Sequence, residues 1–318
     1  MIFNKFFILF KIGRKIGKSN IINIVSETHK IPVFIKIFFN LLSFSFSSSN
    51  ETKSEGKENL SESIQEMGTT FIKLGQFLAT RPDIIGEKLS KELESLQDKL
   101  PPFSKKEAEK IIIENLGQSN FDDIIDLSEP IAAASIAQVH KAKIKEDNII
   151  KNVAIKVLRP NIKKIFNDEI DAIMLLAYIV ESLISKTKRL KLIEVVFLFK
   201  EITNHEMDLR FEAAAANEYA ENTKNDLGFF VPKIYWNFTS ESVLTLDWVD
   251  GVSIREKDLL KEKNIETSKI ATNLIQHFLR HAVRDGFFHA DMHQGNIFIN
   301  ESSQIVPIDF GIMGRIDK

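Results

Sequence analysis

The 318-residue sequence contains no cysteine, no internal repeat and no apolar run long enough to cross a membrane. Without cysteine, the chain cannot build a disulfide scaffold, a thiolate metal site or a thiol nucleophile. The apolar runs near the N-terminus, residues 6–10 and 31–39, fall short of the ~20 residues that a transmembrane helix needs. No small-residue cleavage site follows them, as a signal peptide would require. What is present, 44% hydrophobic and 27% charged residues, is typical of a globular protein.

Positive charge is concentrated at the N-terminus, although the formal net charge of the whole chain is only -2. The first 40 residues hold seven Lys or Arg and one Glu, so the remaining residues carry a net negative charge. A basic segment with bulky apolar neighbours, here residues 1–42, can lie on an anionic membrane surface. A pair of core-packing helices with a basic outer face would have the same pattern, and both interpretations stay open.

The next part of the chain changes from a polar linker to helical spacing. Residues 43–59 are Ser-rich and polar, which predicts a linker. Residues 61–100 have leucines spaced on one helical face, and residues 105–116 form a second amphipathic pattern that ends at Gly117. These patterns predict a helical region over residues 60–128.

Strand-like patterns then precede long helical ones. Residues 137–142 and 153–158 are typical of two strands around a polar turn at 145–148. The later elements that we expect are helices over 162–184, 190–220 and 268–284, strands over 233–237 and 242–249, and a turn at Asp250-Gly251. Because strands and helices do not alternate regularly, the sequence predicts an α+β fold with two lobes.

The most specific motif lies near the C-terminus. His289, Asp291 and Asn296 have the form H-x-D-x4-N, and Asp309-Phe310-Gly311 begins thirteen positions after Asn296. These spacings are typical of the catalytic loop and the metal-binding DFG of protein kinases. Asn296 and Asp309 offer the hard oxygen ligands that Mg²⁺ prefers, and Asp291 is suited to orient or deprotonate an attacking hydroxyl or water. Either motif alone is more often structural, but in this order and spacing they predict a phosphoryl-transfer site.

A lysine in an apolar strand supplies the second part of this site. Val153-Ala154-Ile155-Lys156 matches the V-A-I-K strand whose lysine contacts the α- and β-phosphates of ATP. Such a lysine needs a carboxylate partner to offset its desolvation. Glu206, Asp208 and Glu212 are the candidates, and we favour Glu212. For all three, the alternative is a solvated acidic helix face.

Glycine is missing where a protein kinase has its Gly-rich phosphate loop. Residues 131–139 read I-A-A-A-S-I-A-Q-V, with Ala132, Ala133, Ala134 and Ser135 at the turn. Alanine disfavours the positive φ values that glycine allows, and its methyl group limits how closely the backbone approaches a phosphate. We therefore expect these residues to bind nucleotide differently from an ordinary protein kinase, which argues against phosphotransfer to a protein.

Further motifs make the sequence similar to a known family. These are a K-x-G-Q element (Lys73, Gly75, Gln76), the run from Leu96-Gln97-Asp98 to Pro101-Pro102-Phe103, the Ala-rich loop and the E-x-D pair Glu206 and Asp208. Over residues 60–317 the sequence resembles the UbiB family of atypical protein-kinase-like proteins. An aminoglycoside-phosphotransferase-like small-molecule kinase would share the H-x-D-x4-N motif, but the K-x-G-Q helix argues against it.

The resemblance implies a protein-kinase-like α+β fold with an N-terminal helical extension. The extension would cover residues 60–128, the N-lobe with its Ala-rich loop and a helical insert 129–250, and part of the C-lobe 251–318. Because the chain ends seven residues after Gly311, we expect an incomplete C-lobe, as if truncated after the DFG motif.

The resemblance also implies roles for individual residues. Lys73 and Gln76 would reach into the catalytic site and occlude the place where a protein substrate docks, and Glu206 and Asp208 would engage that inserted helix. The backbone between Asp247 and Val249 would bind the adenine of ATP.

At the level of function, the resemblance implies an ATP-binding, Mg-dependent kinase or ATPase that supports ubiquinone biosynthesis. Such a protein would lie peripherally on the cytoplasmic face of the bacterial inner membrane. We expect contact with nucleotide, with membrane lipid or a quinone precursor and with quinone-biosynthesis proteins, and no nucleic acid. The alternative is a non-catalytic pseudokinase remnant or a partner subunit of such an assembly.

Overall fold

The computed structural model describes residues 2–18, 60–94, 96, 100–183 and 185–316. The chain groups into two compact units, each assembled from segments that are not consecutive. The first, here the helical unit, comprises Met1–Leu100, Ala134–Ile136 and Asn161–Asn204. The second, here the mixed unit, comprises Pro101–Ala133, Ala137–Pro160 and His205–Lys318. The expected linker at 43–59 and most of the basic N-terminal segment lie outside the described residues.

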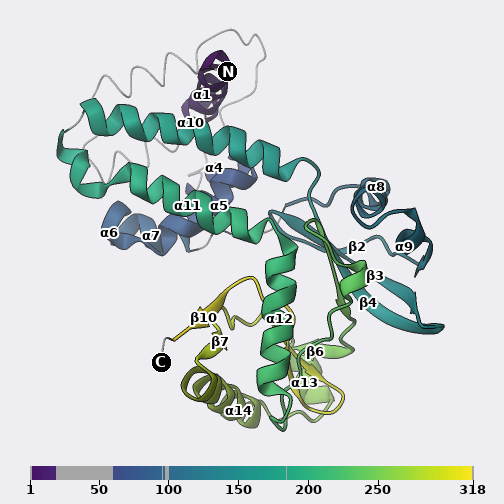
Figure 1. The fold of residues 1–318 in the computed structure, drawn as a ribbon. Helices are drawn as coiled ribbons and strands as arrows, with labels where there is room; N and C mark the ends of the chain where they lie inside the picture. Colours follow the sequence, from purple (N-terminus) through teal and green to yellow (C-terminus); the bar gives the residue numbers. More distant parts are fainter. Residues whose placement is uncertain (1, 19–59, 95, 97–99, 184, 317–318) are drawn as a thin grey trace. The chain divides into compact units, whose positions relative to one another are not determined.

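The helical unit is built from amphipathic helices. Its elements are α1 (Ile2–Lys18), α4 (Leu60–Met67), α5 (Thr69–Ala79), α6 (Pro82–Ile85), α7 (Glu87–Leu93), α10 (Ile162–Leu183), the 3₁₀ turn η1 (Ser185–Leu190) and α11 (Leu192–Glu206), whose last two residues group with the mixed unit. Helices α10 and α11 run antiparallel, side by side (Figure 1). Phe166 packs edge-on against Phe199, with ring centroids 5.5 Å apart.

The N-terminal helix α1 packs onto this unit through its apolar face. Its contacts join four residues of α1 to a small cluster whose buried members include Met67, Phe71 and Ala172. The Nζ of Lys15 donates to the carbonyl of Met67 at 2.8 Å. One face of α1 thus packs against the core, while Phe7 and Phe10 remain exposed, so the choice between core packing and membrane contact stays a prediction for the segment as a whole. Among the described residues, no helix is both long and apolar enough to cross a membrane.

The mixed unit contains an antiparallel sheet in the order β1-β3-β4-β5, with β2 paired to β3. Its strands are β1 (Ile124–Ile125), β2 (Pro130–Ala133), β3 (Ala137–Glu146), β4 (Ile149–Leu158) and β5 (Val243–Asp247). Strands β3 and β4 form the predicted hairpin. Its two-residue turn, Asp147-Asn148, has positive φ at both positions, which are conformations that Asp and Asn tolerate and that match the twist of the strands.

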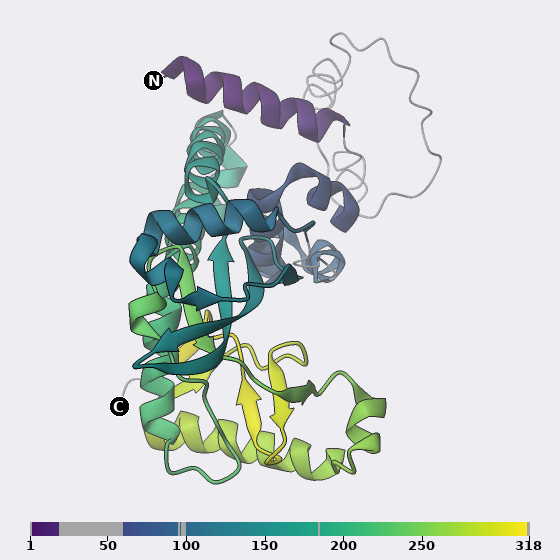
Figure 2. The ribbon, with the colours of Figure 1, turned by 90° about the vertical axis from the view of Figure 1, so that its right-hand side faces the viewer.

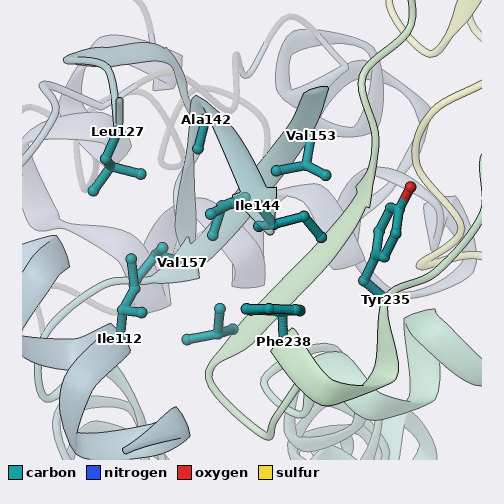
Figure 3. Close-up of a cluster of buried hydrophobic side chains, with 10 residues drawn as sticks. Ile112, Leu127, Ala142, Ile144, Val153, Val157, Tyr235 and Phe238 are labelled. Carbon is teal, nitrogen blue, oxygen red and sulfur yellow. The ribbon is translucent and has the colours of Figure 1, made fainter. Parts of the chain in front are cut away.

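One apolar cluster fixes the sheet against the helix that covers it (Figure 3). It joins Ile144 and Val153 of the hairpin to Ile112 of α8 (Lys105–Leu116) and to Tyr235 and Phe238 of the segment before β5. Helix α8 begins and ends as its sequence predicts: the Ser104 hydroxyl accepts from the Glu107 amide, and Gly117 caps the C-terminus. A short helix, α9 (Gln118–Asp122), follows.

The rest of the mixed unit carries the C-terminal motifs (Figure 2). Its elements are α12 (Leu209–Thr223), the 3₁₀ turn η2 (Trp236–Phe238), β6 (Gly251–Ser253), α13 (Lys257–Glu262), α14 (Thr267–Arg280), the π-helix η3 (His281–Asp285), β7 (Phe287–His289), β8 (Ile297–Asn300), β9 (Ile305–Pro307) and β10 (Met313–Arg315). Two small sheets, β6-β8-β9 and β7-β10, frame the predicted catalytic loop and DFG. Strands and helices without regular alternation confirm the α+β class.

Four predicted elements are wrong in detail. The helix expected over 190–220 is two helices, because Asp208 interrupts it and caps α12 by accepting from the Arg210 amide. Residues 233–237 form no strand: Ile234 makes a single bridge to Leu246, and a 3₁₀ turn begins at Trp236. The α-helix expected to reach Arg284 ends at Arg280 and continues as η3, while Gly251, expected in a turn, begins β6.

The hairpin offers a matched test of the core. We expect Ile144→Ala to lower the free energy of unfolding of the mixed unit by about 2–5 kcal/mol, because Ile144 is fully buried and its removal leaves a cavity. Ile150→Ala, at an exposed site six residues away, should change it by less than about 0.5 kcal/mol. Urea unfolding followed by tryptophan fluorescence checks this, since both tryptophans lie in the mixed unit. Equal effects of the two substitutions would contradict the assigned core.

The buried histidines predict a loss of stability in mild acid. His140, His277, His281 and His289 all have a pKa below the usual value, chiefly because burial disfavours the imidazolium. The unfolded chain, with histidine pKa values near 6.5, binds protons that the folded chain does not. Their contribution is therefore complete above that pKa and is lost as the pH falls through it toward the lower folded values.

We accordingly expect the thermal unfolding temperature of the mixed unit to decrease as the pH is lowered from 7.5 to 5.5. Unfolding in this range should take up protons. Tryptophan fluorescence at a series of pH values checks this. Replacing one of the four buried histidines, as in His140→Asn, should make the unfolding temperature depend less steeply on pH. This holds even if the substitution also shifts the unfolding temperature at neutral pH. An unfolding temperature that stays constant or rises toward pH 5.5 would rule out the assignment.

Candidate functional site

The site is centred on the ammonium group of Lys156, which projects from strand β4. Its Nζ lies 2.9 Å from both carboxylate oxygens of Glu212 on α12 and 3.1 Å from Oδ2 of Asp309. The Glu212 side chain is only 7% exposed and that of Lys156 17%. Of the three candidate partners, the structure therefore pairs Glu212 with Lys156. Asp208 instead caps α12 and forms a two-pronged ion pair with Arg210.

The charges in this cluster do not balance. Burial would lower the pKa of Lys156, but the Asp309 and Glu212 carboxylates outweigh it and raise that pKa, so the amine is charged. Burial would raise the pKa of Asp309, yet Lys156 and the Gly311 amide lower it to about 2. Burial raises the pKa of Glu212, against the opposing charge of Lys156. One ammonium thus serves two carboxylates, and the excess negative charge favours a further cation.

The catalytic-loop motif folds around His289 at the end of β7. The Nδ1 of His289 accepts from the Asp291 amide at 3.1 Å, and its other nitrogen lies 2.6 Å from the carbonyl of Asp309. One nitrogen must therefore accept while the other donates, which is the pattern of a neutral imidazole. Burial lowers the pKa of His289, in agreement with this state. The histidine thus joins the two motifs through their backbones.

Asp291 and Asn296 are brought together as their spacing predicts. The Nδ2 of Asn296 donates to the carbonyl oxygen of Asp291 at 3.3 Å and to its Oδ2 at 3.2 Å. Because these bonds use the nitrogen of the amide, its oxygen is the atom left to bind a cation. The Asp291 side chain is 40% exposed, so its carboxylate is accessible to a reactant.

The DFG segment is held by its buried phenylalanine. Phe310 is 2% exposed, and its amide points to Oε1 of Glu212 at 3.5 Å. The Oδ1 of Asp309 accepts from the Gly311 amide at 3.0 Å, which orients the carboxylate. Asp309 thereby presents oxygen donors beside Lys156. Together with the amide oxygen of Asn296, this donor set suits Mg²⁺, which prefers carboxylate and carbonyl oxygens.

The residues expected at the adenine lie at the end of β5. Asp247 is fixed by three bonds: its amide donates to the carbonyl of Lys233, its Oδ1 accepts from the Tyr235 hydroxyl at 2.6 Å, and its Oδ2 accepts from the Lys233 amide. The Trp248 amide donates to the carbonyl of Asn152. Within the described part of the chain, nothing accepts from the Val249 amide. It is therefore a backbone donor available to a ligand.

Other expected site residues lie in the helical unit. Lys73 and Gln76 are half-buried on α5. Ala134 and Ser135 also group with this unit, where the Thr69 hydroxyl donates to the carbonyl of Ser135 at 3.2 Å. Ala132 and Ala133 belong to β2 of the mixed unit. The roles of these residues, like that of Glu206 at the end of α11, stay predictions.

Sequence reasoning missed a set of four hydrogen-bonded polar side chains in the mixed unit. Tyr219 of α12, Asp226, His281 and Arg284 form a continuous set of hydrogen bonds. They are spread over 66 positions, so no short motif contains them. The only local signal is the pair His277 and His281, which lie four apart and hence on one helical face.

Comparison with known proteins agrees with this geometry. Residues 95–318 match the model of the ABC1 atypical kinase-like domain family. A protein of Marinobacter nauticus named "Probable protein kinase UbiB" is 34% identical over 292 residues, which cover 90% of this chain and 52% of that protein. One of the same name from Pseudomonas paraeruginosa is 31% identical over 314 residues, 97% of this chain and 58% of the relative. The chain thus spans a little over half the length of these curated relatives.

A solved structure is also similar. It is titled "The complex structure of Rv3197-erythromycin from Mycobacterium tuberculosis", with a TM-score of 0.58 and 25% sequence identity over 76% of this chain and 59% of the other. This likeness supports the kinase-like fold that the motifs predict. The matched family domain covers Lys156 with its partners Glu212 and Asp309 (here the lysine clamp), the catalytic loop and the DFG segment alike. The chain therefore belongs to the ABC1 atypical kinase-like family, together with the proteins named UbiB.

Proposed function

We propose that this chain carries the nucleotide site of an ATP-binding, Mg-dependent atypical kinase or ATPase. The observation that carries the proposal is the contact of Lys156 with both Glu212 and Asp309. This contact brings the V-A-I-K strand, α12 and the DFG segment to one point, beside two carboxylates that a single ammonium does not neutralise. A structural ion pair would need only one of them.

Each residue has a definite task in this proposal. Lys156 binds the α- and β-phosphates, and Glu212 keeps its side chain directed there. Asp291 accepts the proton of the attacking hydroxyl or water, and Asn296 holds its carboxylate in place. The free Val249 amide binds the adenine edge.

Asn296 and Asp309 are the residues that would hold Mg²⁺, which neutralises phosphate charge when bound. The fit rests on their oxygen donors: the Asn296 nitrogen is already bonded to Asp291, and Asp309 is ionised near neutral pH with a pKa of about 2. The excess negative charge around Lys156 supports the same assignment.

We further propose that the whole protein supports ubiquinone biosynthesis at a membrane. The support is the similarity to bacterial proteins named UbiB. Peripheral attachment to the inner membrane, contact with lipid or a quinone precursor, and association with quinone-biosynthesis proteins belong to the same proposal. The exposed Phe7 and Phe10 of α1, beside the basic Lys11, would suit an anionic lipid surface.

The second candidate is a nucleotide-binding protein without catalysis. The Ala-rich turn favours it, because three alanines stand where glycine would let the backbone approach the phosphates. Binding without hydrolysis or transfer would support this reading.

Asp309→Asn tests the metal assignment. We expect it to lower Mg-dependent ATP hydrolysis by about 100-fold or more, because it removes a charge worth several kcal/mol in the transition state. The assay uses the full chain with vesicles of anionic lipid, and titration calorimetry measures MgATP affinity in parallel. Asp258→Asn, at an exposed site on α13, is the matched control and should have no effect. Hydrolysis unchanged by Asp309→Asn would refute the metal role.

Lys156→Met tests the charge balance without any nucleotide. It leaves the buried Glu212 without its counter-charge, so we expect the mixed unit to lose about 3–5 kcal/mol of unfolding free energy. Replacing both partners, Lys156→Met with Glu212→Leu, should recover much of this loss, since no unpaired charge then remains on α12. Urea unfolding measures both variants. A double variant no more stable than Lys156→Met would show that the unpaired charge of Glu212 is not the cause of the lost stability.

A further inference from the structure

A buried chain of hydrogen bonds runs from α12 to the helix that precedes the catalytic loop. The hydroxyl of Tyr219 lies 2.7 Å from Nδ1 of His281, and Nε2 of His281 lies 2.9 Å from Oδ2 of Asp226. Arg284 donates to both oxygens of Asp226, at 2.7 and 2.9 Å, and to the carbonyl of Asn222 in α12 at 3.1 Å. Tyr219 and His281 are both fully buried.

The direction of each hydrogen bond follows from Asp226. Its paired guanidinium, followed by the bond from His281, lowers its pKa against the effect of burial, so the carboxylate only accepts. His281 must then donate from Nε2, which leaves Nδ1 to accept from the Tyr219 hydroxyl. Burial lowers the pKa of His281, which agrees with a neutral ring. Every member therefore has a fixed donor or acceptor role.

The position of this series of hydrogen bonds connects it to the lysine clamp. Tyr219 and Glu212 are seven residues apart on α12, which places them two turns apart on one face. His281 and Arg284 belong to the π-helix η3, which leads through Gly286 into β7 and the catalytic-loop residue His289. The Tyr219 ring also packs edge-on against Phe287 and Phe310, at 6.1 and 6.4 Å between centroids.

We propose that Tyr219 and His281 are positioning residues, anchored by Asp226 and Arg284, which lock α12 to the catalytic-loop strand and so keep Glu212 on Lys156. Tyr219 acts on Glu212 through α12, and His281 acts through its hydrogen bond to Tyr219. The proposal deepens the proposed function, on which it rests for its meaning in catalysis, but the geometry of the clamp can be measured without nucleotide.

The same cluster has the donor set of a cation site, since atoms of Asp226, His277 and His281 lie within 4.8 Å of one another. Its charges favour the positioning role. The Asp226 carboxylate already faces Arg284 and, at 3.7 Å, Arg280, and both ring nitrogens of His281 have partners. The guanidinium of Arg284 thus supplies the positive charge that a metal ion would bring.

Tyr219→Phe removes the hydroxyl and keeps the ring, so it breaks the hydrogen bond to His281 without leaving a large cavity. The readout is the rate at which acetic anhydride acylates Lys156, followed by peptide mass spectrometry and normalised to the exposed Lys110. Loosening Glu212 frees the amine, so we expect a rise between about fivefold and 100-fold, the range of an unsatisfied buried polar group. Tyr178→Phe, at an exposed tyrosine on α10, should leave the rate unchanged.

A double-mutant cycle separates positioning from general loosening. In a Glu212→Gln background, adding Tyr219→Phe should change the Lys156 rate by less than about twofold, because the contact through which it acts is already weakened. An equal rise in both backgrounds, or no rise in the wild-type background, would overturn the proposal. Should Tyr219→Phe not fold, as judged by circular dichroism, His281→Asn breaks the link to Asp226 and carries the same expectations.

The MgATP affinity of the same variants tests whether the positioning role of Tyr219 and His281 affects nucleotide binding. We expect Tyr219→Phe to weaken binding about five- to tenfold in the wild-type background. If the wild-type protein binds no MgATP, the proposed function fails, while the acylation rates still decide the positioning role. If MgATP binds normally to Tyr219→Phe and acylation is also unchanged, the positioning role fails and the proposed function stands.

Discussion

The buried ammonium of Lys156 is the charge on which the mixed unit depends. Its partners Glu212 and Asp309 lie 56 and 153 positions away in the sequence. Lys156 therefore has both of its carboxylate partners only when the sheet, α12 and the DFG segment are all in place. An isolated buried charge costs far more than a paired one, so the fold disfavours arrangements in which Lys156 or Glu212 is buried without the other.

Buried neutral histidines connect further segments of the mixed unit by hydrogen bonds. His140, His281 and His289 each offer one donor and one acceptor to defined partners, and so link segments without adding charge. The helical unit shows a different solution: apolar contacts such as those of Ile12, Met67 and Phe71 dominate its described core. The mixed unit thus combines an apolar core with directional bonds between buried polar groups, whereas apolar packing dominates the described core of the helical unit.

Local patterns predicted most of the elements and the centre of the site. The hairpin, α8 and the H-x-D-x4-N geometry follow from spacing within a few residues, and the carboxylate for Lys156 followed from its desolvation. The break before α12 was missed because Asp208 acts as a cap only once the preceding helix has ended. Tyr219 was missed because its partner, His281, is 62 positions distant. Such contacts are properties of the tertiary fold, and no local period encodes them.

The bond from His289 to Asp309 has a consequence for how this site can change. It is made to the carbonyl oxygen of Asp309, and the neighbouring Phe310 anchors the segment by its buried ring. The main chain of the DFG segment therefore has anchors in addition to the bonds that the Asp309 carboxylate makes with Lys156 and the Gly311 amide. A lineage could replace that carboxylate and keep the same loop, so architecture and chemistry can be lost separately. A fold of this kind can outlive its activity and continue as a scaffold.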